Sequence, residues 1–193
     1  MFKPKSISTK LPLLKKLKPD FNNSIVLREP ELKDSTAFVS FLNGLIEEDS
    51  YLTTGPQSEK DEYEYIKSLK DESKKRLGVH LVAVVDGRKI AGVDITNLGN
   101  KRELVGELQL YIDREFRGIG LGKYLIKTAE AQAKKLKKLQ LLILEVFSNN
   151  KVAISLYKKC GYKIWGRLGK SVNHKGKLVD MVYMAKPISR VNE

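Results

Sequence analysis

The chain has 193 residues, 41% of them hydrophobic and 31% charged, which suits one globular domain with a buried core and a charged surface. Its single cysteine excludes an internal disulfide, its two histidines argue against a Cys/His zinc site, and no apolar run reaches the length of a membrane span or a signal-peptide core. We therefore expect a cytoplasmic protein that uses no metal and contacts no membrane.

The net charge of +13, from 36 basic and 23 acidic residues, would attract polyanions such as nucleic acid. The basic residues are spread along the chain, however, and no known nucleic-acid motif accompanies them. A lysine-rich solvated surface is the simpler interpretation, and nucleic acid stays open as a less favoured partner.

Residues 1–22 form a basic segment that we expect to be a flexible tail. It holds six lysines and one acidic residue, and three prolines interrupt any long element. The folded domain is expected over residues 23–187, with a short C-terminal tail over residues 188–193.

Within the domain, short apolar runs alternate with amphipathic stretches. Strands are predicted over residues 24–27, 79–85, 89–95, 104–112, 139–146, 162–167 and 178–185. Helices are predicted from Asp34 or Ser35 to Leu45, and over residues 58–75, about 121–138 and 151–160. The order β-α-α-β-β-β-α-β-α-β-β indicates an α/β (α+β) fold, in which antiparallel hairpins precede a strand-helix-strand crossover in a mixed sheet.

The second and third predicted helices each have an apolar stripe that we expect to face the core. In the second helix the stripe is Tyr63, Ile66 and Leu69. The third helix is expected to leave Glu130 and its lysines in water and to bury Leu121, Leu125, Thr128, Ala129, Gln132, Ala133 and Leu136.

The most informative stretch is residues 117–123, which read Arg-Gly-Ile-Gly-Leu-Gly-Lys and lie between a strand and a helix. A helix N-terminus presents free N–H groups, and glycines let the backbone approach a ligand closely, so the turn predicts a pyrophosphate site. Arg117 and Lys123 would add mobile positive charge. A dinucleotide fingerprint fails because Lys123 replaces its third glycine, and a phosphate-binding loop of the Walker type fails at Arg117 and Tyr124.

Two motifs of this chain resemble those of the GNAT (GCN5-related) N-acetyltransferases. The spacing R-x-x-G-x-G from Arg117 to Gly122 is similar to the acetyl-CoA motif of that family, in the expected position between strand and helix. The segment from Asn150 to Tyr162 looks like the family's N-x-x-A-x-x-L-Y-x-x-x-G-F motif, with Tyr162 in place of phenylalanine. The resemblance extends in element order over residues 24–187.

The resemblance implies a GNAT-type sheet with splayed parallel strands and acetyl-CoA as cosubstrate. In the family, the strand before the glycine turn pairs with the pantetheine arm through its backbone, the amides of the turn hold the pyrophosphate, and an asparagine sits near the pantetheine amides. Carried over, the cofactor-binding residues are Leu110, Tyr111, Ile112, Arg117, Gly118, Ile119, Gly120, Leu121, Gly122, Lys123 and Asn149 or Asn150.

The implied chemistry is direct attack of a primary amine on the thioester, without a covalent enzyme intermediate. Tyr157 matches the family tyrosine that often protonates the leaving thiolate, although packing would also explain it. Glu107 lies on the strand that carries a glutamate base in some members; a pocket-lining role, with water as the base, is equally open. Glu107, Gln109 and Tyr111 are expected on one strand face.

Three other polar residues are expected to lie outside the catalytic machinery. Cys160 is expected in the core at a helix end, His174 exposed on a turn, and Asp180 as a surface charge of a hairpin.

The acceptor stays open between a protein N-terminus, a lysine, an amino acid and a small amine. The basic surface favours an acidic or neutral acceptor, or a protein, because like charges repel. A non-catalytic module that senses acyl-CoA or binds nucleic acid is the alternative. Homodimerisation is a further expectation, since such domains often dimerise.

Overall fold

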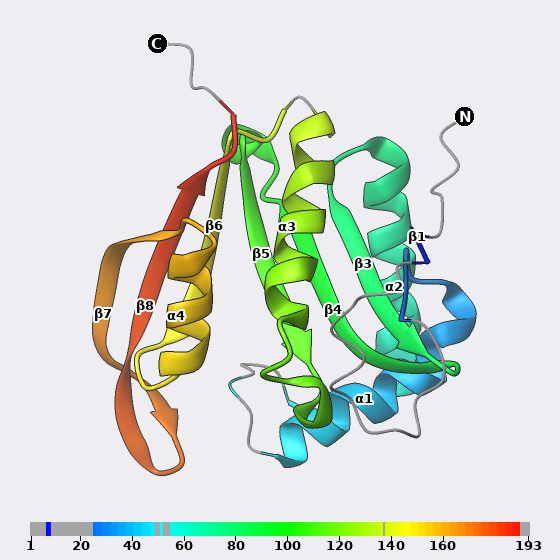
Figure 1. The fold of residues 1–193 in the computed structure, drawn as a ribbon, viewed down its shortest axis with the longest axis horizontal. Coiled ribbons are helices and arrows are strands. Elements are labelled where there is room, and N and C mark those ends of the chain that lie inside the picture. Colours follow the sequence, from blue (N-terminus) through cyan, green and yellow to red (C-terminus); the bar gives the residue numbers. More distant parts are fainter. Residues whose placement is uncertain (1–6, 9–24, 49–50, 52–54, 137, 190–193) are drawn as a thin grey trace.

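The computed structural model describes residues 7–8, 25–48, 51, 55–136 and 138–189. It contains a mixed sheet of eight strands in the order β1-β2-β3-β4-β5-β6-β8-β7, flanked by helices on both faces (Figure 1). The strands are β1 (Ile7–Ser8), β2 (Val26–Arg28), β3 (Val79–Val85), β4 (Arg88–Asn97), β5 (Val105–Ile112), β6 (Leu141–Phe147), β7 (Lys163–His174) and β8 (Lys177–Pro187). The helices are α1 (Ser35–Glu47), α2 (Glu59–Lys75), α3 (Leu121–Ala133) and α4 (Lys151–Lys159).

The predicted order of strands and helices is confirmed from β2 to β8. Among the described strands, β5 and β6 form the only parallel pair, joined by the crossover helix α3. The hairpin between β3 and β4 closes through Asp86 and Gly87, whose φ angles of 50° and 80° suit a tight turn that matches strand twist. The predicted fold class is therefore correct.

The basic N-terminal segment contains one described element. Residues 7–8 form strand β1, which pairs antiparallel with β2 at the edge of the sheet. The rest of the predicted tail, and the start of the first predicted strand at Ser24, lie outside the described residues.

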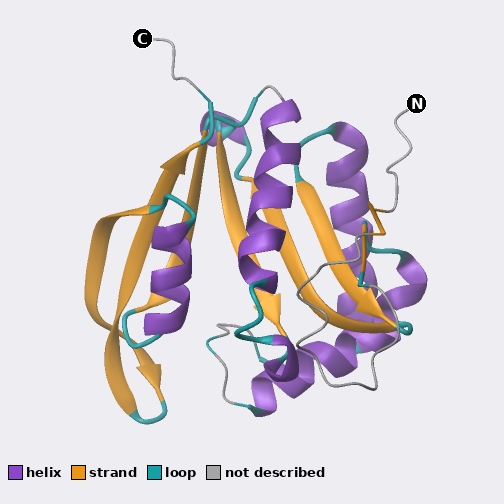
Figure 2. Ribbon diagram, viewed as in Figure 1, coloured by secondary structure: helices purple, strands orange, loops and turns teal. Residues whose placement is uncertain are grey.

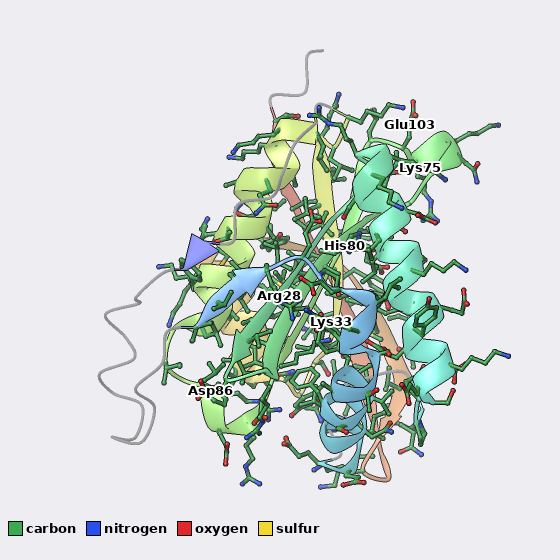
Figure 3. The ribbon with its side chains drawn as sticks, turned by 90° about the vertical axis from the view of Figure 1, so that its right-hand side faces the viewer. Arg28, Lys33, Lys75, His80, Asp86 and Glu103 are labelled. Atoms are coloured by element: carbon green, nitrogen blue, oxygen red, sulfur yellow. The ribbon has the colours of Figure 1, made fainter. Side chains whose placement is uncertain are left out.

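Two layers of helices enclose the sheet. Figure 2 shows α3 and α4 on the near face, and Figure 3, turned by 90°, shows α1 and α2 on the opposite side of the sheet from α3. The main core lies between the sheet and the first pair, where Leu125, Ile126 and Ala129 of α3 are fully buried. Under α1 and α2 the apolar clusters are smaller, which leaves room on that face for polar side chains.

The start of α2 follows from a capping box. The Ser58 hydroxyl oxygen accepts from the Asp61 backbone N–H at 3.2 Å, and the Asp61 carboxylate accepts from the Ser58 N–H at 3.1 Å. The predicted stripe of this helix is partly wrong. Ile66 and Leu69 are buried, but Tyr63 is 40% exposed and Glu62 is buried in its place. The buried face of α2 therefore includes Glu62 in place of Tyr63.

The polar side of α3 also differs from the prediction. Glu130 is buried, with its carboxylate accepting from the Lys186 ammonium of β8 at 2.6 Å, while Thr128 and Gln132 are only half-buried. The ion pair with a lysine on a neighbouring strand allows the charge of Glu130 to be buried, and helix periodicity cannot show this contact.

Within the described part of the chain, no helix combines the length and apolar character needed to cross a bilayer.

Candidate active site

The glycine turn has the open backbone geometry that the sequence predicts. Gly118 and Gly120 have φ angles of 78° and 86°, in the left-handed region that favours glycine, and α3 begins at Leu121. A Cβ atom built at Gly118 would meet nothing within 4 Å, so the turn is not packed against other residues at this point. The first amides of α3 have no carbonyl of their own helix to bind, which is the arrangement that a helix N-terminus offers to an anion.

Gly122 has a different function, in close packing. A Cβ atom at this position would lie 2.9 Å from Leu156 Cδ2 and 3.0 Å from Ile112 Cδ1. The absence of a side chain lets the N-terminal end of α3 approach both β5 and α4. The residues of the turn therefore fit a pyrophosphate group, because the helix end is held at the edge of the strands.

Beside this turn, β5 and β6 separate. Their pairing covers only three steps, from Val105 opposite Leu141 to Glu107 opposite Ile143. The two strands diverge in Figure 2, and the register places the start of this divergence after Glu107, while β5 keeps its pairing with β4 as far as Ile112. The β6-facing edge of β5 is thus left without a strand partner from Leu108 onward, which provides backbone groups for an extended ligand.

The predicted pantetheine-binding residues lie along this free edge. Leu110 and Ile112 point towards the core under α3, and Tyr111 points to the other face, where it packs against a cluster on α1. The Tyr111 hydroxyl donates to the side-chain oxygen of Gln109, which confirms that these two side chains share a face.

Arg117 is less mobile than expected. Its Nε donates to the Ile112 carbonyl oxygen at 2.8 Å, and its Nη2 donates to Glu48 Oε2 at 3.0 Å. Lys123 is exposed on the first turn of α3. The positive charge beside the turn is therefore partly neutralised by Glu48, a residue that sequence analysis did not single out.

The two asparagines after β6 have separate functions. Asn150 caps α4, since its side-chain oxygen accepts from the Ala153 N–H at 3.1 Å, and Asn149 Nδ2 lies 2.8 Å from His174 Nδ1. Each asparagine side chain thus already has one partner within the chain, and these contacts do not favour one of the two as the cofactor-binding residue.

Tyr157 lies on α4 and is buried, with its ring 6.0 Å from that of Tyr162 in an edge-on contact. Burial raises the pKa of Tyr157 to about 12. The Tyr157 hydroxyl makes no hydrogen bond to the described residues. The residue thus packs in the core and also keeps a proton that is free for donation.

Glu107 is half-buried at the last step of the β5–β6 pairing, where these two strands begin to separate. Sequence analysis missed its neighbour Glu145 on β6. The pKa of Glu145 is raised, first by burial and then by the charge of Glu107. The sequence separation of 38 residues hid this pair, and only the parallel register of β5 and β6 brings it together.

The expected exposure of His174 is wrong. The residue is buried at the end of β7, stacked on Tyr51 with ring centroids 4.6 Å apart and 5.6 Å from the ring of Phe147. Tyr51 belongs to the connection between α1 and α2, so this aromatic cluster joins that connection to the β7–β8 hairpin. The turn that follows His174 is correctly predicted, but a partner distant in sequence covers the ring.

The predictions for Cys160 and Asp180 are consistent with the structure. Cys160 is buried at the end of α4. Asp180 accepts from Arg167 Nη1 and from the Lys170 N–H, both at 3.0 Å, and these bonds lower its pKa. Asp180 therefore stabilises its own hairpin.

A buried polar cluster under α2 was not foreseen. His80 contacts Asp94 at 3.1 Å and Glu72 at 3.2 Å, and Figure 3 places it between the sheet and α2. Burial alone would lower its pKa, but the two carboxylates more than offset that effect and raise it to about 9. Nearby, burial raises the pKa of Glu62 to about 7 and lowers that of Lys89, whose ammonium lies 3.8 Å from the ring centre of Phe38.

A groove of about 700 Å³ lies between α1, the β3–β4 turn and residues 113–115. None of its lining residues belongs to β6 or α4, so it lies beside the opening between β5 and β6 and not within it. Charges along it are partly paired, since Arg88 contacts Asp113 at 2.5 Å and Glu115 at 3.4 Å. The groove therefore does not contain the candidate catalytic residues.

A sheet that opens between two parallel strands, with a glycine turn at the mouth, defines the class of acyl-transfer proteins that the sequence motifs resemble. Residues 43–162 match the acetyltransferase (GNAT) family, and the chain belongs to this family. Among solved structures, a GNAT-family acetyltransferase from Streptococcus pneumoniae superposes with a TM-score of 0.78 at 26% identity, over 86% of this chain and 99% of that one. A phosphinothricin acetyltransferase from Sinorhizobium meliloti, solved in complex with AcCoA, has the same fold, with a TM-score of 0.70 at 20% identity over 84% of this chain and 88% of that one.

Sequence relatives match over shorter segments. A spermine/spermidine N(1)-acetyltransferase from Bacillus subtilis is 35% identical over 69 residues, which is 36% of this chain and 45% of that protein. The chain spans about half the length of the curated relatives that it matches. Their acceptors differ by name, so the acceptor of this chain has to be inferred from its own residues.

Proposed function

We propose that this protein is an N-acetyltransferase that moves the acetyl group of acetyl-CoA to a primary amine. The observation that carries the proposal is the coincidence of two features: the glycine turn at residues 117–123, and the free edge of β5 next to it. An anion cradle and an unpaired strand edge suit the pyrophosphate and the amide-containing arm of one extended cofactor.

In the proposed reaction the neutral amine attacks the thioester carbonyl carbon. A C–N bond forms, the C–S bond breaks, and coenzyme A leaves as a thiolate. The ammonium form of the amine must first lose a proton, which Glu107 accepts directly or through one water. A backbone N–H on the free edge, near Leu110 or Ile112, stabilises the oxyanion of the tetrahedral intermediate.

Tyr157 acts on the leaving sulfur in this scheme. Because its pKa is raised to about 12, the phenol stays protonated at neutral pH. A thiol titrates near ~8.5, so complete proton transfer from the phenol is uphill. Tyr157 therefore stabilises the thiolate by a hydrogen bond. The second proton of the attacking nitrogen, lost as the intermediate collapses to the amide, passes through water to the thiolate.

The proposal is tested first by the shift in thermal midpoint with acetyl-CoA and CoA, with NADH and ATP as controls. A ligand that binds only the folded state adds about 2.7 kcal/mol at a hundred times its Kd. A shift specific to acetyl-CoA and CoA supports the cofactor assignment. Equal shifts with all four anions would reduce the glycine turn to an unspecific anion site and remove the main support.

The second test separates an enzyme from a binding module, with release of free thiol measured over a panel of amines. Tyr157→Phe should reduce kcat at least tenfold and leave acetyl-CoA binding unchanged, since the hydroxyl makes no hydrogen bond within the described chain. Thiol release that is no faster than the uncatalysed background in the wild-type protein would favour a module that binds acyl-CoA without turnover.

A further inference from the structure

We propose that Glu145 selects the acceptor, by binding a second positive charge on the amine while Glu107 receives the proton of the reacting ammonium. The acceptor class is an aliphatic diamine or polyamine. This inference rests on the proposed function and narrows its substrate.

The register of the two parallel strands brings these carboxylates to one place. Glu107 lies opposite Ile143, and Glu145 is two residues further along β6, so both side chains project from the same face of the sheet. The alternate residues Leu142 and Leu144 are buried in the main core on the other face. Glu145 therefore stands where β5 and β6 separate, on the side opposite α3 and α4.

Neither carboxylate is compensated in the described part of the chain. The carboxylates of Glu107 and Glu145 make no hydrogen bond or ion pair there, although the protein has 36 basic residues against 23 acidic ones. Two like charges on adjacent strands repel, and the raised pKa of Glu145 reflects this repulsion in addition to burial. A cation bound between them would remove the penalty.

An aromatic surface continues from this pair. Tyr183 of β8 lies opposite Glu145 in the antiparallel register, so its ring stands on the same face. Trp165 of β7 contacts that ring, with centroids 5.5 Å apart, and is 62% exposed. Aromatic ring faces attract ammonium groups, and they also pack against the methylene groups that link the two amines of a diamine. The carboxylate of an amino-acid acceptor would gain no such attraction from the ring faces.

Glu145 and Trp165 are exposed on this face, and Tyr51 of the α1–α2 connection packs further along it on Phe147 and His174. The main contacts of α1 and α2 with the sheet are to β3 and β4, and α4 covers the opposite side of β6 and β8 (Figure 1). The overall charge of +13 repels a cation at long range, so discrimination has to arise from groups in contact with the acceptor. The net charge of the protein favours acidic or neutral acceptors, but the two carboxylates on this face favour a cationic acceptor instead.

The experiment compares three acceptors with the same four-carbon spacing: 1,4-diaminobutane, n-butylamine and 4-aminobutanoate. Their far ends are cationic, apolar and anionic. The expected order of kcat/KM is diamine, butylamine, aminobutanoate. In Glu145→Gln the KM for the diamine should rise about tenfold, with kcat within twofold and the KM for butylamine unchanged.

Two controls keep the result interpretable. Glu103→Gln removes another exposed carboxylate near the start of β5, paired with Lys138 at 3.1 Å, and should change none of these constants. Glu145→Gln should fold at least as stably as wild type, because it removes a repulsion. The diamine alone should raise the thermal midpoint of wild type in the presence of CoA, but not that of Glu145→Gln.

The outcomes separate this inference from the proposed function. If acetyl-CoA shifts the thermal midpoint but 4-aminobutanoate is the best acceptor, or if Glu145→Gln weakens diamine and butylamine equally, Glu145 does not select the acceptor. If acetyl-CoA gives no shift and no amine releases thiol, the acetyltransferase proposal fails as well.

Discussion

The Nε of Arg117 donates a hydrogen bond to the backbone oxygen of Ile112 at 2.8 Å, which ties the first residue of the glycine turn to the end of β5. The same guanidinium contacts Glu48 at the end of α1 at 3.0 Å. One side chain therefore links the candidate pyrophosphate cradle to both the strand edge and the opposite helical layer.

Releasing Arg117 from Glu48 is expected to strengthen acetyl-CoA binding. In Glu48→Gln the guanidinium loses its carboxylate partner and its charge becomes available to phosphate. An exposed ion pair is worth roughly 0.2–1 kcal/mol, so the Kd measured by calorimetry should fall by up to about fivefold, with little change in Tm. Arg117→Met should instead weaken binding about tenfold or more. Unchanged affinity in both variants would show that Arg117 does not contact the cofactor.

Gly122→Ala is expected to destabilise the protein by about 1–3 kcal/mol, because the new methyl group would collide with Leu156 and Ile112. Denaturant unfolding measures this effect, and acetyl-CoA affinity should fall with it as the helix end moves. The matched control is Gly44→Ala within α1, where a methyl group meets nothing within 4 Å. That change should stabilise by roughly 0.5–1 kcal/mol. Equal effects of the two substitutions would refute the close-packing argument.

His80 should make stability depend on pH. Its folded-state pKa of about 9 lies above the ordinary value near 6.5, so its contribution is fully present below pH 6.5 and is lost as pH rises through about 9. We expect the free energy of unfolding to fall over this window in wild type, with a smaller slope in His80→Gln. Identical slopes would mean that the imidazole is not charged between Asp94 and Glu72.

Glu62 should oppose stability above neutral pH. Burial raises its pKa to about 7, and its Oε1 has no hydrogen-bond partner in the described structure. The folded state therefore binds the proton more tightly than the unfolded chain, and stability is lost as pH rises from about 4.5 through 7. Glu62→Gln should raise Tm at pH 8 and have little effect at pH 4. Glu64→Gln, on the exposed side of α2, should stay within about 0.5 kcal/mol of wild type at both values.

Sequence periodicity was sufficient for the order of the elements, because the alternation of strands and the repeat of helices are local properties. Local signals also gave the Asp86–Gly87 turn and the glycine turn before α3. The alignment of one helix failed by one residue at Tyr63, since a charged helix such as α2 has too few apolar residues to define its buried face.

The sequence by itself determined the family motifs, the position of the glycine turn and the candidates Glu107 and Tyr157, all of which depend on residues close together in the chain. Only the tertiary structure decided which distant groups meet: Glu145 beside Glu107, and His174 beneath Tyr51. The physical reason is that strand register and loop packing depend on the whole core. A short segment of sequence therefore does not determine which residues it contacts across the sheet.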